Sequence, residues 1–465
     1  MPITRVLFLI AFLAASSIMN AQGILKLEYT FTPDISSPKP ILHVEMTFAG
    51  NDSGIATIVL PTTWAGERDL FKSIQNIHSL DPDCKVNSTA SPASLLMQCP
   101  PGHNFRIVYD LASDWTGELR HPKEFRVLVK ESHLIFNGQN GLVHPKIDQN
   151  AQVRVGFRWK NLPDGWKVAS SFGSNRSEQI FRGQWHEVYN ALFSAGDFRI
   201  THLQSAGERL TLAALGSWNF SDQQAAEEIL NIFRVEREFW GERKRNSFLV
   251  VLAPFDQDFG SSDGTAFSNA FLLYLSRKQT FLIDEKSLLA HEIFHGWNPL
   301  RMGIPQGEET NWFTEGFTRY YQDRILMQAK LIDYPQYLER LNKIVAEYWS
   351  SPDSNWRGAM IALWVDERIR QFSAGKSSLD EKMFSLVQKK PDRHLTTEFL
   401  LSVLSEGMSN EDASALRSFV ELGKNIPLPK NLALHCGSLI QSDGTAPYYT
   451  LATGQCGVQL AKRIK

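Results

Sequence analysis

Residues 288–297 read Leu-Leu-Ala-His-Glu-Ile-Phe-His-Gly-Trp, and the apolar positions of this stretch recur at helical spacing. On a helix, His291 and His295 lie one turn apart on the same side, so both imidazoles can reach one metal ion. Glu292 is rotated by about 100° from His291, so its carboxylate can contact an attacking water without ligating the metal. The stretch therefore predicts a helix that carries two metal ligands and a general base.

A third ligand candidate, Glu315, stands 20 residues after His295, at the start of another helical pattern. Two histidines and one glutamate, with the fourth position open, form the ligand set of catalytic rather than structural zinc. These donor types also favour zinc over copper or iron. We predict one Zn²⁺ per chain, held by His291, His295 and Glu315. The alternative, a helix whose two histidines are merely hydrogen-bonded, gives no account of Glu315.

This ligand set predicts hydrolysis of peptide bonds. Zinc polarises the scissile carbonyl and acidifies water, and Glu292 takes the proton of that water and later passes it to the leaving amine. The expected partner is thus a peptide or protein substrate. A formal charge of −2, with 21% charged residues, lacks the basic excess that nucleic-acid binding requires, so no nucleic-acid partner is expected.

The first 21 residues have the pattern of a secretory signal peptide. Arg5 supplies a positive start, residues 6–15 form an apolar run, and residues 16–21 are small and polar enough for a cleavage region. The apolar run is about ten residues long, short of the roughly 20 that span a bilayer. We predict cleavage after residue 21, no transmembrane segment in the mature chain, and export to the periplasm or the medium.

The four cysteines fall into two local pairs. Cys84 with Cys99, and Cys436 with Cys456, lie in stretches rich in Pro, Ser and Gly. In an exported protein this pattern predicts two disulfides. A metal site built from all four thiolates would need closer spacings than the chain offers.

At 465 residues the chain is long enough for several domains of about 100–200 residues each. Residues 22–170 alternate apolar and polar positions between turns rich in Gly, Pro and Asn, which predicts an antiparallel β sandwich. Residues 171–330 combine a capped helix after Phe220 with short apolar strands, and residues 331–424 are helical in pattern. Residues 425–465 turn irregular. The overall prediction is a multidomain α+β protein.

Several motifs beyond the two histidines resemble one known family. They are His295-Gly-Trp-Asn298, the Glu-Gly-Phe-Thr-Arg-Tyr-Tyr run of residues 315–321, Arg357-Gly-Ala359 leading into residues 366–370, and Pro163-Asp-Gly-Trp166. Together they resemble the glycyl aminopeptidase family of gluzincin metallopeptidases, whose members often carry a C-terminal PDZ domain. The resemblance implies a β-rich N-terminal domain, a thermolysin-like zinc catalytic domain and a helical C-terminal domain.

The chain departs from this family at three places. Related aminopeptidases bind the substrate amino group with the Glu of a Gly-x-x-Glu motif, and Phe267 falls at that position after Gly264. The family's tyrosine that stabilises the oxyanion is replaced by Asn355, whose amide can still donate a hydrogen bond. The residues after Asn425 are too few for a PDZ domain. Asp263, four positions before Phe267, is a candidate substitute for the missing carboxylate.

The sequence thus predicts a zinc metallopeptidase that is aminopeptidase-like by family, with endopeptidase activity left open by the missing glutamate. A second hypothesis, from a different class, is a catalytically weak or inactive peptide-binding protein on a peptidase scaffold. The two replaced substrate-binding residues motivate that hypothesis. The presence of Glu292, which binds no metal, argues against it.

Overall fold

The computed structural model describes residues 24–36, 38–119, 123–205, 207–242, 247–256, 262–277, 283–305, 307–351, 353–389, 394–432, 437–440 and 446–451. Within these residues, no helix has both the length and the hydrophobicity to cross a membrane. The predicted signal peptide, residues 1–21, and the predicted partners Cys436 and Cys456 lie outside the described residues.

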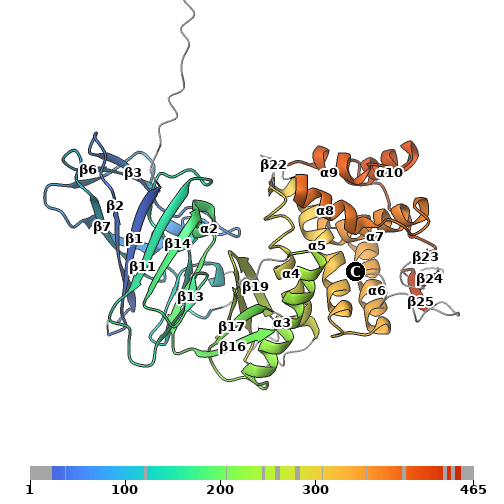
Figure 1. The fold of residues 1–465 in the computed structure, drawn as a ribbon, viewed down its shortest axis with the longest axis horizontal. Coiled ribbons are helices and arrows are strands. Elements are labelled where there is room, and N and C mark those ends of the chain that lie inside the picture. The colour runs from blue at the N-terminus through green and yellow to red at the C-terminus, as the bar shows by residue number, and fades with distance from the viewer. Residues whose placement is uncertain are drawn as a thin grey trace, which may run out of the picture.

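Three sheets form the N-terminal β region (Figure 1). The six-stranded sheet has the order β14-β11-β1-β2-β7-β4, the four-stranded sheet β10-β3-β6-β5, and the five-stranded sheet β13-β12-β15-β9-β8. The elements are β1 (Leu25–Asp34), β2 (Ile41–Phe48), β3 (Ile55–Val59), β4 (Ile74–Ser79), β5 (Lys85–Ser88), β6 (Ser94–Gln98), β7 (Phe105–Leu111), β8 (Leu128–Val129), β9 (His133–Asn137), β10 (His144–Pro145), β11 (Gln152–Trp159), β12 (Lys167–Ser170), β13 (Gly173–Ser174), β14 (Glu178–Gln184), β15 (Leu192–Gly196), α1 (Gly138–Gly141), α2 (Trp185–Tyr189), η1 (Leu70–Ser73) and η2 (Lys123–Phe125).

Alternating burial along β1 contributes to the main apolar core of this region. In β1, Leu27, Tyr29 and Phe31 are buried while their neighbours are more exposed, as the period-two pattern predicted. One pair departs from the predicted antiparallel arrangement, because β1 runs parallel to β11. Parallel neighbours need a long connection, and here the chain between them supplies β2 to β10. The N-terminal sheets also continue past residue 170, through β15.

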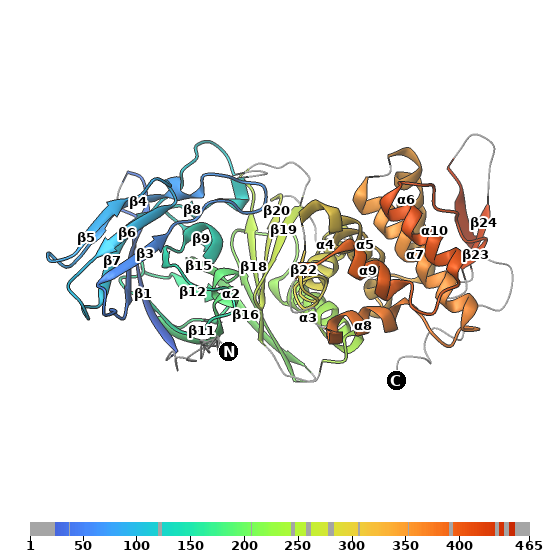
Figure 2. The same ribbon diagram turned by 90° about the horizontal axis from the view of Figure 1, so that it is seen from above.

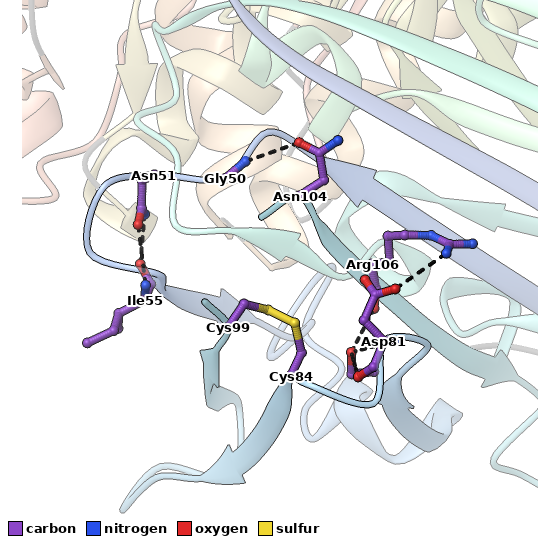
Figure 3. The surroundings of a disulfide bond; sticks show 9 residues. Gly50, Asn51, Ile55, Asp81, Cys84, Cys99, Asn104 and Arg106 are labelled. Atoms are coloured by element: carbon purple, nitrogen blue, oxygen red, sulfur yellow. Dashed lines mark hydrogen bonds and ion pairs between the residues drawn. A yellow bond between two sulfur atoms is a disulfide. The ribbon is translucent and has the colours of Figure 1, made fainter. Parts of the chain in front are cut away.

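The predicted disulfide between Cys84 and Cys99 is present in this region (Figure 3). It joins the loop before β5 to the residue after β6, across a sequence separation of 15. Near the disulfide, Nη1 of Arg106 lies 3.5 Å from Oδ1 of Asp81, which belongs to the same loop as Cys84. A bond that closes a loop of this length contributes about 3 kcal/mol in the chain-entropy model.

A second region is built on a five-stranded sheet of order β16-β17-β18-β20-β19. Strands β17, β18 and β20 are parallel neighbours, while β16 and β19 are antiparallel edge strands. Two helices accompany the sheet. The bounds are β16 (Arg199–Ser205), β17 (Glu208–Ala214), α3 (Asp222–Phe239), β18 (Ser247–Pro254), β19 (Ser262–Phe267), β20 (Ala270–Leu275) and α4 (Ile283–Phe294).

Both faces of this sheet are covered. On β18, Phe248, Val250 and Leu252 belong to the core shared with α3 and α4. The alternate residues Leu249 and Val251 belong to a core shared with residues of the N-terminal region. Figure 2 shows the resulting order along the molecule, with the N-terminal sheets, the five-stranded sheet and the helices side by side. This burial on both sides explains why the sequence of β18 is a nearly continuous apolar run.

The C-terminal half is largely helical. Its elements are β21 (Ile304–Pro305), η3 (Gly307–Thr310), α5 (Asn311–Gln328), α6 (Tyr334–Ser350), α7 (Ser354–Phe372), α8 (Leu379–Lys389), β22 (His394–Leu395), α9 (Thr397–Leu404), α10 (Asn410–Glu421), β23 (Asn431–Leu432), β24 (Gly437–Ile440) and β25 (Tyr448–Leu451).

The irregular segment expected after residue 425 contains three short strands in its described part, paired antiparallel as β23-β24-β25. This sheet is anchored on α6, since the amide of Asn342 bonds both the backbone N–H and the carbonyl of Tyr449. This contact with α6, rather than a strong strand pattern in the sequence, explains why the segment forms a sheet.

Helices α5 and α7 approach closely at a pair of glycines. A Cβ added to Gly316 would overlap the backbone of Gly358, and a Cβ on Gly358 would overlap the carbonyl oxygen of Trp312. Neither backbone can move without shifting its helix. The missing side chains therefore allow α5, and with it Glu315, to sit against α7.

We expect Gly358→Ala to lower the melting temperature by several degrees, because overpacking of a close contact costs about 1–3 kcal/mol. The added methyl also pushes α5 away from α7, so the zinc content should fall. Thermal unfolding and metal analysis of the purified protein measure both effects. Ser354→Ala, an exposed change in the first turn of α7, is the control. An unchanged melting temperature in Gly358→Ala would contradict this account of the crossing.

Candidate metal centre

Three side chains from two helices converge at one point. His291 lies in α4, His295 directly follows α4, and Glu315 lies in the second turn of α5. One ligand atom from each residue lies within 4.8 Å of the others. The carboxylate oxygen of Glu315 is 3.2 Å from Nε2 of His291 and 3.5 Å from Nε2 of His295. The structure thus brings together the three residues that the sequence nominated as metal ligands.

The helical turn continues past the end of α4, since the N–H of His295 donates to the carbonyl of His291 over 3.3 Å. The two imidazole centroids are 4.7 Å apart and the rings are nearly perpendicular, at 87°. With this arrangement both Nε2 atoms face Glu315, and both rings expose a nitrogen toward one point.

The other ring nitrogen of each histidine has a fixed partner. Nδ1 of His291 is 2.9 Å from Oε1 of Gln322, whose amide nitrogen donates to Ser287. Nδ1 of His295 is 2.8 Å from the carbonyl of Asn298. Both partners are acceptors, so each Nδ1 carries the proton and each Nε2 is free to ligate. Partners of this kind orient metal-binding histidines and raise their basicity.

The sequence analysis did not nominate Gln322 or Asn298. Gln322 follows Glu315 by seven residues, two helical turns along the same face of α5, and this spacing was a usable signal. Asn298 is fully buried, and its amide nitrogen lies 3.1 Å from Thr318 and 3.3 Å from the carbonyls of Phe313 and Thr314. Its role depends on a loop that meets α5, which no local pattern predicts.

The charges in the centre suit a cation. Burial lowers the pKa of His291 to about 4. Burial also acts to lower the pKa of His295, but the hydrogen bond and charge of Glu315 and the charge of Glu292 raise it to about 9. The pKa of Glu315 lies well below its usual range, since both imidazoles outweigh its burial. A zinc ion would replace the proton that these three groups share, and their donor set fits it.

Glu292 lies beside the edge strand β19. Its carboxylate accepts a hydrogen bond from the backbone N–H of Ala266. Burial, offset by His295 and reinforced by the negative charges of Glu315 and Asp263, raises its pKa to about 7. A carboxylate with a pKa near neutral pH can both take and return a proton.

Phe267 is the residue that the sequence analysis matched to the family's amine-binding glutamate. It ends β19, is only 6% exposed, and packs against Trp64 with ring centroids 5.6 Å apart. Its side chain belongs to the apolar layer between the five-stranded sheet and the N-terminal region. Asp263, at the other end of the same strand, accepts from the N–H of Gly264 and lies close enough to influence Glu292.

Asn355 lies in the first turn of α7 and is half-buried. Its backbone N–H donates to Asp353, the N-cap of α7. The next residue, Trp356, carries the guanidinium of Arg319 over its ring at 4.2 Å. Asn355 thus lies near α5, but its hydrogen bond to Asp353 belongs to the N-terminal cap of α7.

Comparison with known proteins agrees with this reading. The family model of the M61 glycyl aminopeptidases matches residues 284–362, the segment that contains all three candidate ligands. No curated protein is significantly similar in sequence.

Solved structures show the same fold at low identity. An aminopeptidase N family protein from Idiomarina loihiensis superposes with a TM-score of 0.74 at 18% identity, over 90% of this chain and 81% of that chain. An M1 zinc metallopeptidase from Deinococcus radiodurans gives a TM-score of 0.56 at 16% identity, over 87% of this chain and 95% of that chain. A mutant of an M1 zinc metallopeptidase from Deinococcus radiodurans, bound to a Tyr-Ser-Ala substrate, gives 0.53 at 14% identity, over 87% and 95% of the two chains.

The chain thus has the fold of these metallopeptidases, and its His-His-Glu cluster lies in the segment that the M61 family model matches. Within that class, the match over residues 284–362 supports the glycyl aminopeptidase family, and the resemblance inferred from the sequence is confirmed.

We expect Gln322→Leu to weaken zinc binding by about 10- to 100-fold, because Nδ1 of His291 loses the acceptor that orients the ring. Gln322→Glu keeps an acceptor at the same distance and should retain most of the affinity. Competition with a chromogenic chelator measures both constants. Equal affinities in the wild type and Gln322→Leu would remove Gln322 from the metal centre.

Proposed function

We propose that the protein is a zinc-dependent peptidase that binds one Zn²⁺ through His291, His295 and Glu315. The observation that carries this proposal is the convergence of these three ligand atoms within 4.8 Å, beside the uncoordinated Glu292. Two imidazoles and one carboxylate leave a fourth position open, as catalytic zinc requires.

A zinc ion bound by these ligands would supply a Lewis acid for the scissile carbonyl and for the attacking water. Glu292 takes the proton of that water and returns it to the leaving amine. The N–H of Ala266 holds the Glu292 carboxylate in place. Because β19 is an edge strand of its sheet, its outer side can offer backbone groups to an extended peptide.

The competing proposal is a peptide-binding protein without catalysis. Phe267 and Asn355 favour it, because neither supplies the amine-binding carboxylate or the phenol that the family uses. The half-buried Glu292 favours an enzyme. A binder gains nothing from a carboxylate held at high free-energy cost beside the metal ligands, whereas a peptidase needs it.

We also propose that the chain is not a strict aminopeptidase. A free amino group that enters a partly desolvated site needs a carboxylate partner, and an unpaired charge there costs several kcal/mol. Phe267 is packed against Trp64 and offers no charge. A peptide that continues past the site carries no charge at that position, so it loses nothing. Asp263 remains the one nearby carboxylate on β19 that can take the amino group.

Export is a further part of the proposal. The signal-like residues 1–21 support it, and the disulfide between Cys84 and Cys99 fits an oxidising compartment such as the periplasm. In such a compartment the substrates are peptides or proteins outside the cytosol.

Glu292→Gln should keep the fold and one zinc per chain while turnover falls by about 10³-fold or more, because the general base is lost and the ligands stay. His291→Ala should lose both the metal and the activity. Zinc analysis and hydrolysis of a mixed peptide library, with and without a chelator, separate the two effects. Unchanged turnover in Glu292→Gln would place the chemistry elsewhere.

We expect one peptide to be hydrolysed with an acetylated amino terminus at a rate within about tenfold of the free peptide, since Phe267 offers no carboxylate to the amine. Asp263→Asn, which keeps the acceptor for the Gly264 N–H, should abolish any residual preference for the free amine. Rates of both peptides with both proteins decide the point. A strong preference for the free amine that persists in Asp263→Asn would refute the proposed loss of amino-terminal selectivity.

A further inference from the structure

Arg319 lies one helical turn after Glu315 on the same face of α5. Its guanidinium carbon stands 4.2 Å from the ring centroid of Trp356, at the start of α7. The charge of Arg319 acts on His291, and the charge of Glu315 acts on Arg319. A fixed positive charge therefore lies beside the metal centre, on the side of α5 that faces α7.

This arginine has no ion pair within the described part of the chain. Its Nε is buried without a hydrogen-bond partner, whereas its two terminal nitrogens are not among the buried unpartnered atoms. The side chain as a whole is half-buried. The terminal nitrogens are thus the part that an incoming group can reach.

Three carboxylates whose charges act on Arg319 have other partners. Glu315 lies between the two imidazoles. Asp323 accepts from Ser287 over 3.0 Å and from Arg340 over 2.6 Å. Asp353 caps α7 by accepting from two backbone N–H groups, 2.9 and 3.0 Å away. All three influence Arg319 through their charge, but none forms an ion pair with it.

Two other arginines of the helical region have carboxylate partners. Arg324, also on α5, contacts Asp380 at 3.0 Å, and Arg340 on α6 contacts Asp284 and Asp323. A guanidinium stays charged in a protein, and a desolvated charge without a partner is costly. Stacking on Trp356 covers one face of the Arg319 guanidinium and leaves its edge available, which is the edge that binds a carboxylate through two parallel hydrogen bonds.

We propose that Arg319 receives a carboxylate of the peptide substrate next to the metal centre, so that the enzyme favours substrates that carry one there. This inference rests on the proposed peptidase function. The carboxylate has two sources, the α-carboxylate at the end of a short peptide or the side chain of an Asp or Glu near the scissile bond. Both present the same planar pair of oxygens.

A different role for Arg319 makes a different prediction. Asn355 replaces the tyrosine of the family, and an arginine nearby could instead stabilise the oxyanion of the transition state. That oxyanion forms with every substrate, so replacing Arg319 would slow the hydrolysis of all peptides equally. A substrate carboxylate is present only in some peptides. If Arg319 binds it, replacing Arg319 would change the preference for peptides with a carboxylate over peptides without one.

The test compares kcat/KM for paired peptides with the zinc-loaded protein. One pair differs only in a free or amidated carboxyl terminus. Further pairs place Asp or its isostere Asn at successive positions on either side of the scissile bond. We expect the wild type to favour the carboxylate member of at least one pair by about 10- to 100-fold. In Arg319→Gln the ratio should fall to about 1, and Arg319→Lys should keep part of it because the charge remains.

Arg368→Gln is the matched control. Arg368 stacks on Trp364 of the same helix α7 at 5.4 Å, far along the helix from the metal centre, and pairs with Asp412. Its replacement should leave the ratios of the wild type unchanged. Melting temperature and zinc content show whether each variant is folded and loaded.

The pair that shows the preference identifies the source of the carboxylate. Ratios near 1 for every pair in the wild type would overturn the inference, and so would an equal loss for both members of each pair in Arg319→Gln. If the loaded wild type hydrolyses none of the peptides, the proposed function fails by itself. Calorimetric binding of the same pairs to the wild type and to Arg319→Gln then tests the inference, and affinities without a carboxylate preference would overturn it.

Discussion

The position of the Glu315 carboxylate between two imidazoles is the interaction on which the centre depends. Three buried or half-buried polar groups within a few ångströms are unfavourable unless they share a proton or a cation. Keeping them together requires α5 to stay within reach of α4. Two contacts do this: the buried amide of Asn298 ties the segment after α4 to the start of α5, and the pair Gly316 and Gly358 lets α5 rest against α7.

The same packing gives the site its electrostatic character. His291 is buried and Glu292 and His295 are half-buried, so burial and one another's charges shift their pKa values. The edge strand β19 then determines what approaches this centre. Its Ala266 N–H holds Glu292, its Phe267 seals the strand end against Trp64, and its Asp263 keeps one carboxylate nearby. Arg319 adds a positive charge on the side of α5 that faces α7.

Much of the fold followed from local patterns. The alternation in β1 and β2, the Ser221 cap of α3 and the helical spacing around His291 are short-range signals, and the structure has each of these elements. The parallel pairing of β1 with β11 was not predictable in this way, because a strand's own pattern does not reveal its neighbour. The small C-terminal sheet was missed for a related reason, since its order depends on Asn342 of a distant helix.

The same distinction between local patterns and tertiary contacts applies to the metal centre. The sequence by itself determined the candidate chemistry: His291 and His295 share a helical face because 3.6 residues complete a turn, Glu292 falls beside them, and the residue types favour zinc. Only the tertiary structure decided which groups surround that chemistry. Gln322 and Asn298 orient the imidazoles, and Phe267 is packed against Trp64. Among the described residues Arg319 has no carboxylate in an ion pair, because Asp323 and Asp353 have other partners. The physical reason is that helical periodicity is a property of neighbouring residues, whereas burial and pairing depend on segments that meet only in the folded chain.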